Sequence, residues 1–198
     1  MANGLPCIIV AGMGRCGTSL TMQMLEAAGV PCIGGWPDFE TDASSIEGFD
    51  PSWFAGLSGC AIKLIDPANL PITDMPNHIV VWLDRDPTQQ AKSQAKLLKV
   101  LGLNIGRSAT RTLAADLRNT REKHRARVGV PGGCPATTLR FENMITDPAF
   151  AAERLSAFLA SYGWATDPEA MAAQVKPRPA TCLPGFLEAD LLESRGMA

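Results

Sequence analysis

A short segment near the start of the chain combines glycines, one cation and two hydroxyl side chains. Residues 12–19 read GMGRCGTS, and the glycine spacing matches the Walker A loop, whose backbone N–H groups surround a phosphate. Thr18 stands where that loop has its lysine, whereas Arg15 supplies a permanent cation. We therefore predict a phosphate-binding loop; the alternative is a tight strand-to-helix turn without a ligand. The residues predicted to form the loop are Gly12, Gly14, Arg15, Cys16, Gly17, Thr18 and Ser19.

One loop residue, Cys16, lies just before an expected helix, where a thiol can acquire the lowered pKa of a nucleophile. The phosphatase pattern of this kind has an arginine six positions after its cysteine, and that position here is Met22. We therefore interpret Cys16 as a small filler residue within the loop.

A second basic site is predicted further along, in the segment DRDPTQQAKS. Arg85 precedes a helix expected to begin at Pro87, and Ser93 lies nearly two turns into that helix. Arg85 and Ser93 can then converge on one phosphate, although an ion pair of Arg85 with a flanking aspartate is the alternative. Two separate phosphate sites without a Walker lysine suit a nucleotide with two separate phosphate groups better than a triphosphate, and magnesium is then not obligatory.

These two segments resemble the nucleotide-binding motifs of the sulfotransferases that use 3′-phosphoadenosine-5′-phosphosulfate (PAPS), particularly bacterial members. GMGRCGTSL resembles their 5′-phosphosulfate loop, and Arg85 with Ser93 resembles their 3′-phosphate motif, over roughly residues 5–160. The resemblance implies a P-loop fold and PAPS as the donor, with adenosine 3′,5′-bisphosphate (PAP) as product. It also implies that Arg15 is the loop cation.

The resemblance extends to the segment AIKLIDP, which is similar to the family's lysine-containing strand near the transferred sulfate. It implies that Lys63 and Arg15 stabilise the leaving oxygen; a lysine at a strand end reaching water is the alternative. Cytosolic members often have a catalytic histidine where this chain has Ile65. His78 should lie at the opposite edge of the sheet, and His124 lies in an arginine-rich helix, so we expect a carboxylate base.

The segment SIEGFDPSWF resembles the acceptor loop of bacterial members and nominates Asp50 as that base, with Glu47 and Asp66 as rivals. Each of the three is alternatively a solvated surface carboxylate. TTLRFENMITDP resembles the end of the last core strand, where Phe141 replaces the usual tyrosine and can pack near adenine. The carboxyl-terminal RKGxxGxW element of cytosolic members is absent. Its phosphate contacts could come from Lys176 and Arg178, or the tail simply carries prolines.

The elements that must position these residues alternate between strands and helices. Apolar, β-branched runs predict buried strands at 7–11, 61–65 and 79–83, with a weaker case at 137–141. Asp-Pro pairs at 86–87, 147–148 and 167–168 predict three helix starts. This alternation predicts a three-layer α/β/α sandwich around a mainly parallel sheet of about four or five strands, with ligands beyond the carboxyl ends of the strands.

Composition limits the class of protein. The chain has 198 residues, of which 46% are hydrophobic, and we expect one domain over 1–198 that lies in the cytoplasm and outside membranes. Its net charge of −2 gives no general attraction for nucleic acid, so we expect no nucleic-acid partner. Six cysteines without a CxxC pair and only two histidines indicate no metal site. We expect 34–59 to be an acceptor or lid loop and 176–198 an irregular segment.

An arginine stripe on one expected helix adds a further possibility. Arg107, Arg111, Arg118 and Arg125 recur at four- and seven-residue steps, which favours a solvated face over a site for an anionic acceptor such as an acidic glycan.

The resulting hypothesis is a sulfotransferase that acts on a hydroxyl or amine of a small-molecule or glycan acceptor. The alternatives are an atypical P-loop kinase for small molecules, which would require magnesium and ATP, and a nucleotide-binding module without catalysis. The sequence indicates neither the acceptor nor the oligomeric state.

Overall fold

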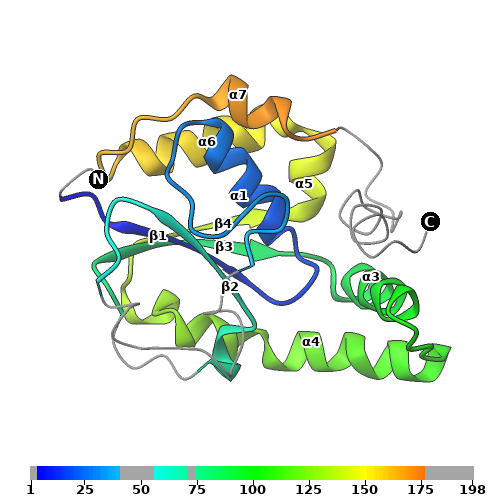
Figure 1. Cartoon of the computed structure of the whole chain (residues 1–198). Coiled ribbons are helices and arrows are strands. Elements are labelled where there is room, and N and C mark those ends of the chain that lie inside the picture. Colours follow the sequence, from blue (N-terminus) through cyan, green and yellow to red (C-terminus); the bar gives the residue numbers. More distant parts are fainter. Residues whose placement is uncertain (1–3, 41–55, 71–74, 177–198) are drawn as a thin grey trace.

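A four-stranded, fully parallel sheet forms the centre of the computed structural model, which describes residues 4–40, 56–70 and 75–176 (Figure 1). Its spatial order is β2-β1-β3-β4. All six residues of β1 are buried, because helices cover both faces of the sheet, and this explains the continuous apolar runs in the sequence. The strands are β1 (Cys7–Gly12), β2 (Ala61–Ile65), β3 (His78–Asp84) and β4 (Ala136–Arg140).

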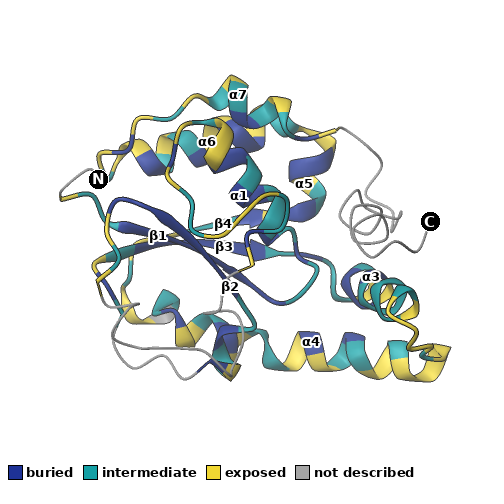
Figure 2. Ribbon diagram, viewed as in Figure 1, coloured by how far each residue is buried: buried dark blue, intermediate teal, exposed yellow. Residues whose placement is uncertain are grey.

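Helices pack on both faces of the sheet and confirm the predicted three-layer α/β fold (Figure 1). One face carries α1 (Thr18–Ala27), α5 (Phe141–Thr146), α6 (Pro148–Ala160) and α7 (Pro168–Ala173), and the other carries α3 (Pro87–Val100) and α4 (Arg107–Arg127). Short 3₁₀ turns, η2 (Pro67–Asn69) and η3 (Val130–Gly132), complete the described elements. Exposed residues lie mostly on the outer sides of the helices and in the connecting segments, whereas β1, β2 and β3 are largely buried (Figure 2). Among the helices described, none is long and apolar enough to cross a membrane.

The three Asp-Pro pairs begin helices as predicted. Each aspartate caps its helix by accepting a backbone N–H: Asp86 from Gln89 at 2.9 Å, Asp147 from Phe150 at 3.1 Å, and Asp167 from Glu169 at 2.9 Å. These caps fix where α3, α6 and α7 begin.

The predicted strand at 137–141 requires a correction at its end. β4 ends at Arg140, and Phe141 is the first residue of α5. The pattern of apolar residues in the sequence does not reveal where the strand ends and the helix begins, because a buried apolar residue such as Phe141 suits both elements. As the first residue of α5, Phe141 places its ring against Gly17.

The strand order reverses between β1 and β3, and we call the region beyond the carboxyl ends of these two strands the crevice. These two strands are neighbours, with Gly12 opposite Leu83 at their carboxyl ends. The chain leaves β1 toward α1 on one face and leaves β3 toward α3 on the other face (Figure 1). Such a divergence of connections is where open parallel sheets bind ligands. The turn after β1 and the turn after β3 both border this crevice.

Candidate active site

The turn between β1 and α1 is so tightly packed that two of its glycines cannot be replaced without displacement. A Cβ atom added to Gly12 would lie 2.3 Å from the Sγ atom of Cys16. Gly17 has a φ of 107°, and its added Cβ would lie 2.7 Å from the Phe141 ring. The backbone of this loop can therefore approach a ligand closely, as phosphate-binding loops require.

Side chains from α3 hold the outer side of the loop. Gln90 Nε2 donates to the carbonyl oxygens of Met13 at 3.0 Å and Gly14 at 2.8 Å, and Gln94 Nε2 donates to Gly14 at 3.0 Å. Carbonyl oxygens repel anions. Because the glutamine amide groups occupy these carbonyl oxygens, the loop is better suited to hold an anion on its inner side. The sequence analysis did not identify either glutamine; their i, i+4 spacing after a phosphate-binding motif was the available signal.

The two predicted basic sites meet at the crevice. Arg15, in the loop, donates from Nε to the Oγ atom of Ser93 at 3.2 Å. Arg85 donates from Nη1 to the carbonyl oxygen of Arg15 at 3.0 Å. Arg85 and Ser93 are buried, with 7% and 4% of their surface exposed. Two cations and a hydroxyl from segments about 70 residues apart therefore form one cluster.

The Arg85 side chain and backbone are held by residues from three elements. Its guanidinium lies over the Phe141 ring, with the central carbon 4.2 Å from the ring centroid. Arg121 of α4 donates to the Arg85 carbonyl at 2.8 Å and forms an ion pair with Asp84 at 2.8 Å. Asp86 meanwhile caps α3. Arg121 was not identified from the sequence, because its 37-residue separation from Asp84 follows no local periodicity.

Lys63 occupies the centre of β2 and is fully buried. Its Nζ atom donates to Ser19 Oγ at 3.3 Å, to the Asp38 carbonyl oxygen, and to Glu40 Oε1 at 2.5 Å. The alternative of a lysine at a strand end reaching water is therefore wrong. Lys63 instead places a cation beside the first turn of α1, and a half-exposed carboxylate, Glu40, pairs with it.

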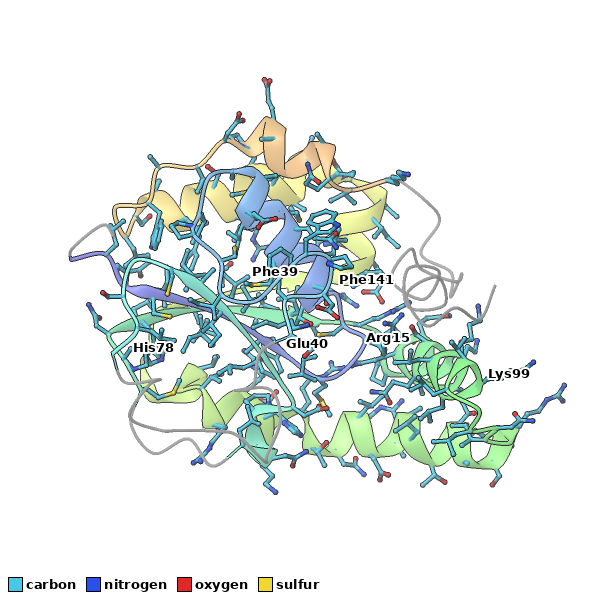
Figure 3. The ribbon with its side chains drawn as sticks, in the orientation of Figure 1. Arg15, Phe39, Glu40, His78, Lys99 and Phe141 are labelled. Carbon is cyan, nitrogen blue, oxygen red and sulfur yellow. The ribbon has the colours of Figure 1, made fainter. Side chains whose placement is uncertain are left out.

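A compact turn at residues 34–40 positions Glu40. Phe39 is completely buried, with a φ of 56°, and lies edge-on to Trp36 at 6.2 Å between ring centroids. Gly34 leaves no room for a side chain, because its added Cβ would lie 2.7 Å from the Phe39 carbonyl. Gln23 of α1 donates to the Pro37 carbonyl at 2.7 Å. Figure 3 shows Glu40, Arg15 and Phe141 toward the end of the sheet opposite His78.

Comparison with models of protein families and with curated protein sequences finds no match. Solved structures do match. Retinol dehydratase in complex with androsterone and inactive cofactor PAP is 17% identical, with a TM-score of 0.52, over 85% of this chain and 62% of that chain. The sulfotransferase domain from the curacin biosynthetic pathway is 13% identical, with a TM-score of 0.53, over 96% and 91%. Sulfotransferase STF9 from Mycobacterium avium is 12% identical, with a TM-score of 0.55, over 98% and 76%.

This chain has the sulfotransferase fold. Its architecture was therefore predicted correctly as an α/β sandwich of the P-loop kind. The chain spans 62% of the length of retinol dehydratase and the same share of a mouse sulfotransferase in complex with PAP.

Within this sulfotransferase fold, Asp66 lies directly after β2 and contacts the loop that follows β1. Its Oδ1 atom accepts the Gly14 N–H at 3.3 Å. Burial raises the pKa of Asp66, while His124 and the Gly14 N–H oppose that rise. Glu47 and Asp50, the other carboxylates proposed from the sequence, lie outside the described residues, as does Arg178. Lys176 is the last residue described.

Neither His78 nor His124 lies in the cluster formed by Arg15, Arg85 and Ser93. His78 begins β3, at the edge opposite the loop, as predicted, and its Nε2 atom is 3.3 Å from Cys134 Sγ. His124 of α4 accepts the Ala68 N–H at Nδ1, at 3.1 Å. Burial lowers the pKa of His124, although the nearby Asp66 carboxylate opposes that effect.

The loop thiol is unsuited to nucleophilic chemistry. Cys16 is 1% exposed, and burial raises its pKa to about 12, with a further contribution from Asp66. The thiol is therefore protonated at neutral pH and fills the space beneath the loop, as interpreted from the sequence. Across residues 4–40, 56–70 and 75–176, no group of three or more His, Cys, Asp or Glu side chains is arranged to hold a metal ion.

Proposed function

We propose that this chain transfers a sulfuryl group from PAPS to a hydroxyl or amine of a small-molecule or glycan acceptor. The observation that carries the proposal is the junction of Arg15, Arg85 and Ser93 beside a glycine-rich loop. We expect this junction to supply two adjacent anion-binding groups at one crevice. A nucleotide with separate 3′ and 5′ anionic groups matches that pair, whereas ATP carries all its phosphates at the 5′ position.

The residues present suit the two ends of PAPS. Loop N–H groups and the N-terminus of α1 would hold the 5′-phosphosulfate, with the hydroxyls of Thr18 and Ser19 in its first turn. Arg85 and Ser93 would hold the 3′-phosphate through charge-assisted hydrogen bonds. Phe141, buried beneath Arg85, would pack near the adenine ring. The PAP complexes of the two structural neighbours support this assignment.

Two cations flank the position where charge would develop. When bound, PAPS supplies an activated sulfuryl group, whose bond to the 5′-phosphate oxygen breaks as the acceptor bonds to sulfur. Lys63, buried and 3.3 Å from Ser19, would offset negative charge on that departing oxygen. Arg15 would act from the loop side. Because these fixed cations neutralise the developing charge, we propose that the reaction requires no metal.

Glu40 is our candidate for the group that accepts the acceptor's proton. Its carboxylate touches Lys63, and its side chain is 46% exposed, so it can meet an acceptor arriving from solvent. Asp66 is bound to the Gly14 N–H, and we assign it to loop support instead. Glu47 and Asp50 remain rival candidates from the sequence.

A ligand comparison followed by a transfer assay tests this function. PAP at about a hundred times its Kd should stabilise the chain by about 2.7 kcal/mol, which raises the Tm of a protein of this size by roughly 5–10 °C. ATP with magnesium should give no comparable shift. Radiolabelled PAPS should then yield PAP and labelled product in an acceptor screen. A shift with ATP and magnesium alone would indicate a kinase, and PAP binding without transfer to any acceptor would indicate a binding module; either result contradicts the proposal.

A further inference from the structure

A cationic cavity of about 840 Å³ lies between α3 and α4, and we call it the α3–α4 groove. Within the described part of the chain, no aspartate or glutamate lines it. A volume of this order is typical of sites for small ligands. Its five cationic lining residues are Lys92 and Lys96 from α3, and Arg107, Arg111 and Arg118 from α4.

The helix spacing explains why the charges face one another. Lys92 and Lys96 are one turn apart on α3, and the three arginines follow at steps of four and seven residues on α4. Small side chains, among them Ala95 and Ala114, line the groove between these two rows. The groove therefore offers two rows of cations around an apolar floor.

The arginine stripe expected from the sequence is divided by the structure. Arg125, its last member, lies outside the groove, with its guanidinium 5.9 Å from the Trp82 ring centroid and an ion pair to Glu122 at 3.6 Å. The remaining three arginines gain two lysines from a separate helix, which a pattern within one helix could not show. The three groove arginines are exposed, whereas Arg125 is partly buried, so the stripe is not one uniform solvated face.

The groove and the crevice use different faces of α3. Ser93, Gln90 and Gln94 contact the loop after β1, whereas Lys92 and Lys96 line the groove. Steps of about 100° per residue place these two sets on different sides of the helix. The groove is therefore distinct from the nucleotide-binding residues proposed above.

Charge provides the reason to expect a ligand. The chain has a net charge of −2, so it has no general attraction for anions, yet five cations gather around one cavity. Like charges at this spacing repel each other, and an anion with several charged groups relieves that repulsion along both walls at once. A single monovalent anion could engage only a few of these residues.

We infer that the α3–α4 groove binds a small polyanion that carries several sulfate or phosphate groups. Four of the five cations, Lys92 and the three arginines, are exposed and accessible from solvent. The binding requires no transfer chemistry, and it goes beyond the proposed function.

Calorimetric titration of the full chain tests this inference with two probes, sucrose octasulfate and inositol hexakisphosphate, in about 0.15 M salt. Saturating PAP is included so that the nucleotide crevice does not contribute. We expect at least one probe to bind at a single site, and more weakly at higher salt. A preference for the first probe would assign sulfate esters, and a preference for the second would assign phosphate esters.

Variants locate the site. The double variant R111Q/R118Q should weaken binding at least about tenfold, and K92Q/K96Q on the opposite wall should do the same independently. The matched control is K123Q, which removes one exposed charge from α4 outside the groove and should leave the affinity unchanged. Circular dichroism establishes that each variant is folded.

Three results would overturn the inference: no saturable binding of either probe, equal weakening by the K123Q control, or unchanged affinity in both double variants. Failure of PAP to bind would contradict the proposed function but would leave this test intact, because the comparison between groove and control variants does not depend on PAP.

Discussion

Replacing Gly17 by alanine should destabilise the fold strongly, for two separable reasons. The residue has a φ of 107°, where an L-residue is strained by about 1–3 kcal/mol. The new Cβ would also lie 2.7 Å from the Phe141 ring, which is buried and stacked under Arg85, so overpacking adds about 1–3 kcal/mol. We expect a loss of about 2–6 kcal/mol in the free energy of unfolding, measured by urea denaturation.

A matched variant separates the two contributions. Gly29 has a φ of 83° with nothing within 4 Å of an added Cβ, so G29A should cost only the backbone part, about 1 kcal/mol. In a double-mutant cycle, F141L should recover about 1–2 kcal/mol in the G17A background by removing the ring contact. If G17A costs no more than G29A, or if the cycle shows no coupling, the packing described for the loop is incorrect.

Three further predictions concern individual side chains. E40Q should lower turnover about a hundredfold or more while leaving the Kd of PAP unchanged, whereas a parallel change in both would remove Glu40 from proton transfer. Cys16 should resist iodoacetamide at pH 8 in the folded protein and react after unfolding, as judged by peptide mass spectrometry; rapid labelling of the folded chain would contradict its raised pKa. Burial lowers the pKa of His124, so the unfolded chain binds the extra proton more readily, and stability should fall as pH drops below about 6.5. H124N should reduce that slope by at most about 1.36 kcal/mol per pH unit, the limit for one titrating group, and an unchanged slope would exclude this cause.

The elements of the fold could be predicted where local chemistry determines them. β2 was located from an apolar run at 61–65 that only Lys63 interrupts, and Asp86-Pro87 marked the start of α3 through a cap that involves neighbouring residues only. Phe141 shows the limit of this approach. Its place at the beginning of α5 depends on packing against Gly17, which lies more than a hundred residues earlier.

The candidate site could be predicted in its motifs but not in its connections. Arg85 and Ser93 were identified from their spacing after a strand, whereas the contact of Ser93 with Arg15 depends on β1 and β3 being neighbours. Glu40 was missed because its partner, Lys63, lies 23 residues away across a turn without periodicity. Tertiary contacts of this kind leave no local pattern in one sequence.

In the function proposed above, Arg85 binds the 3′-phosphate of a nucleotide whose 5′ end lies in the loop after β1. Calorimetry of PAP and adenosine 5′-monophosphate, which lacks that phosphate, against the unaltered chain and R85Q tests it most directly. A charge-assisted hydrogen bond of about 1.5–3 kcal/mol predicts that the unaltered chain prefers PAP by roughly ten- to a hundredfold. R85Q should lose most of that preference and retain its affinity for the monophosphate. Equal binding of both nucleotides by the unaltered chain, or a preference that survives in R85Q, would contradict the account.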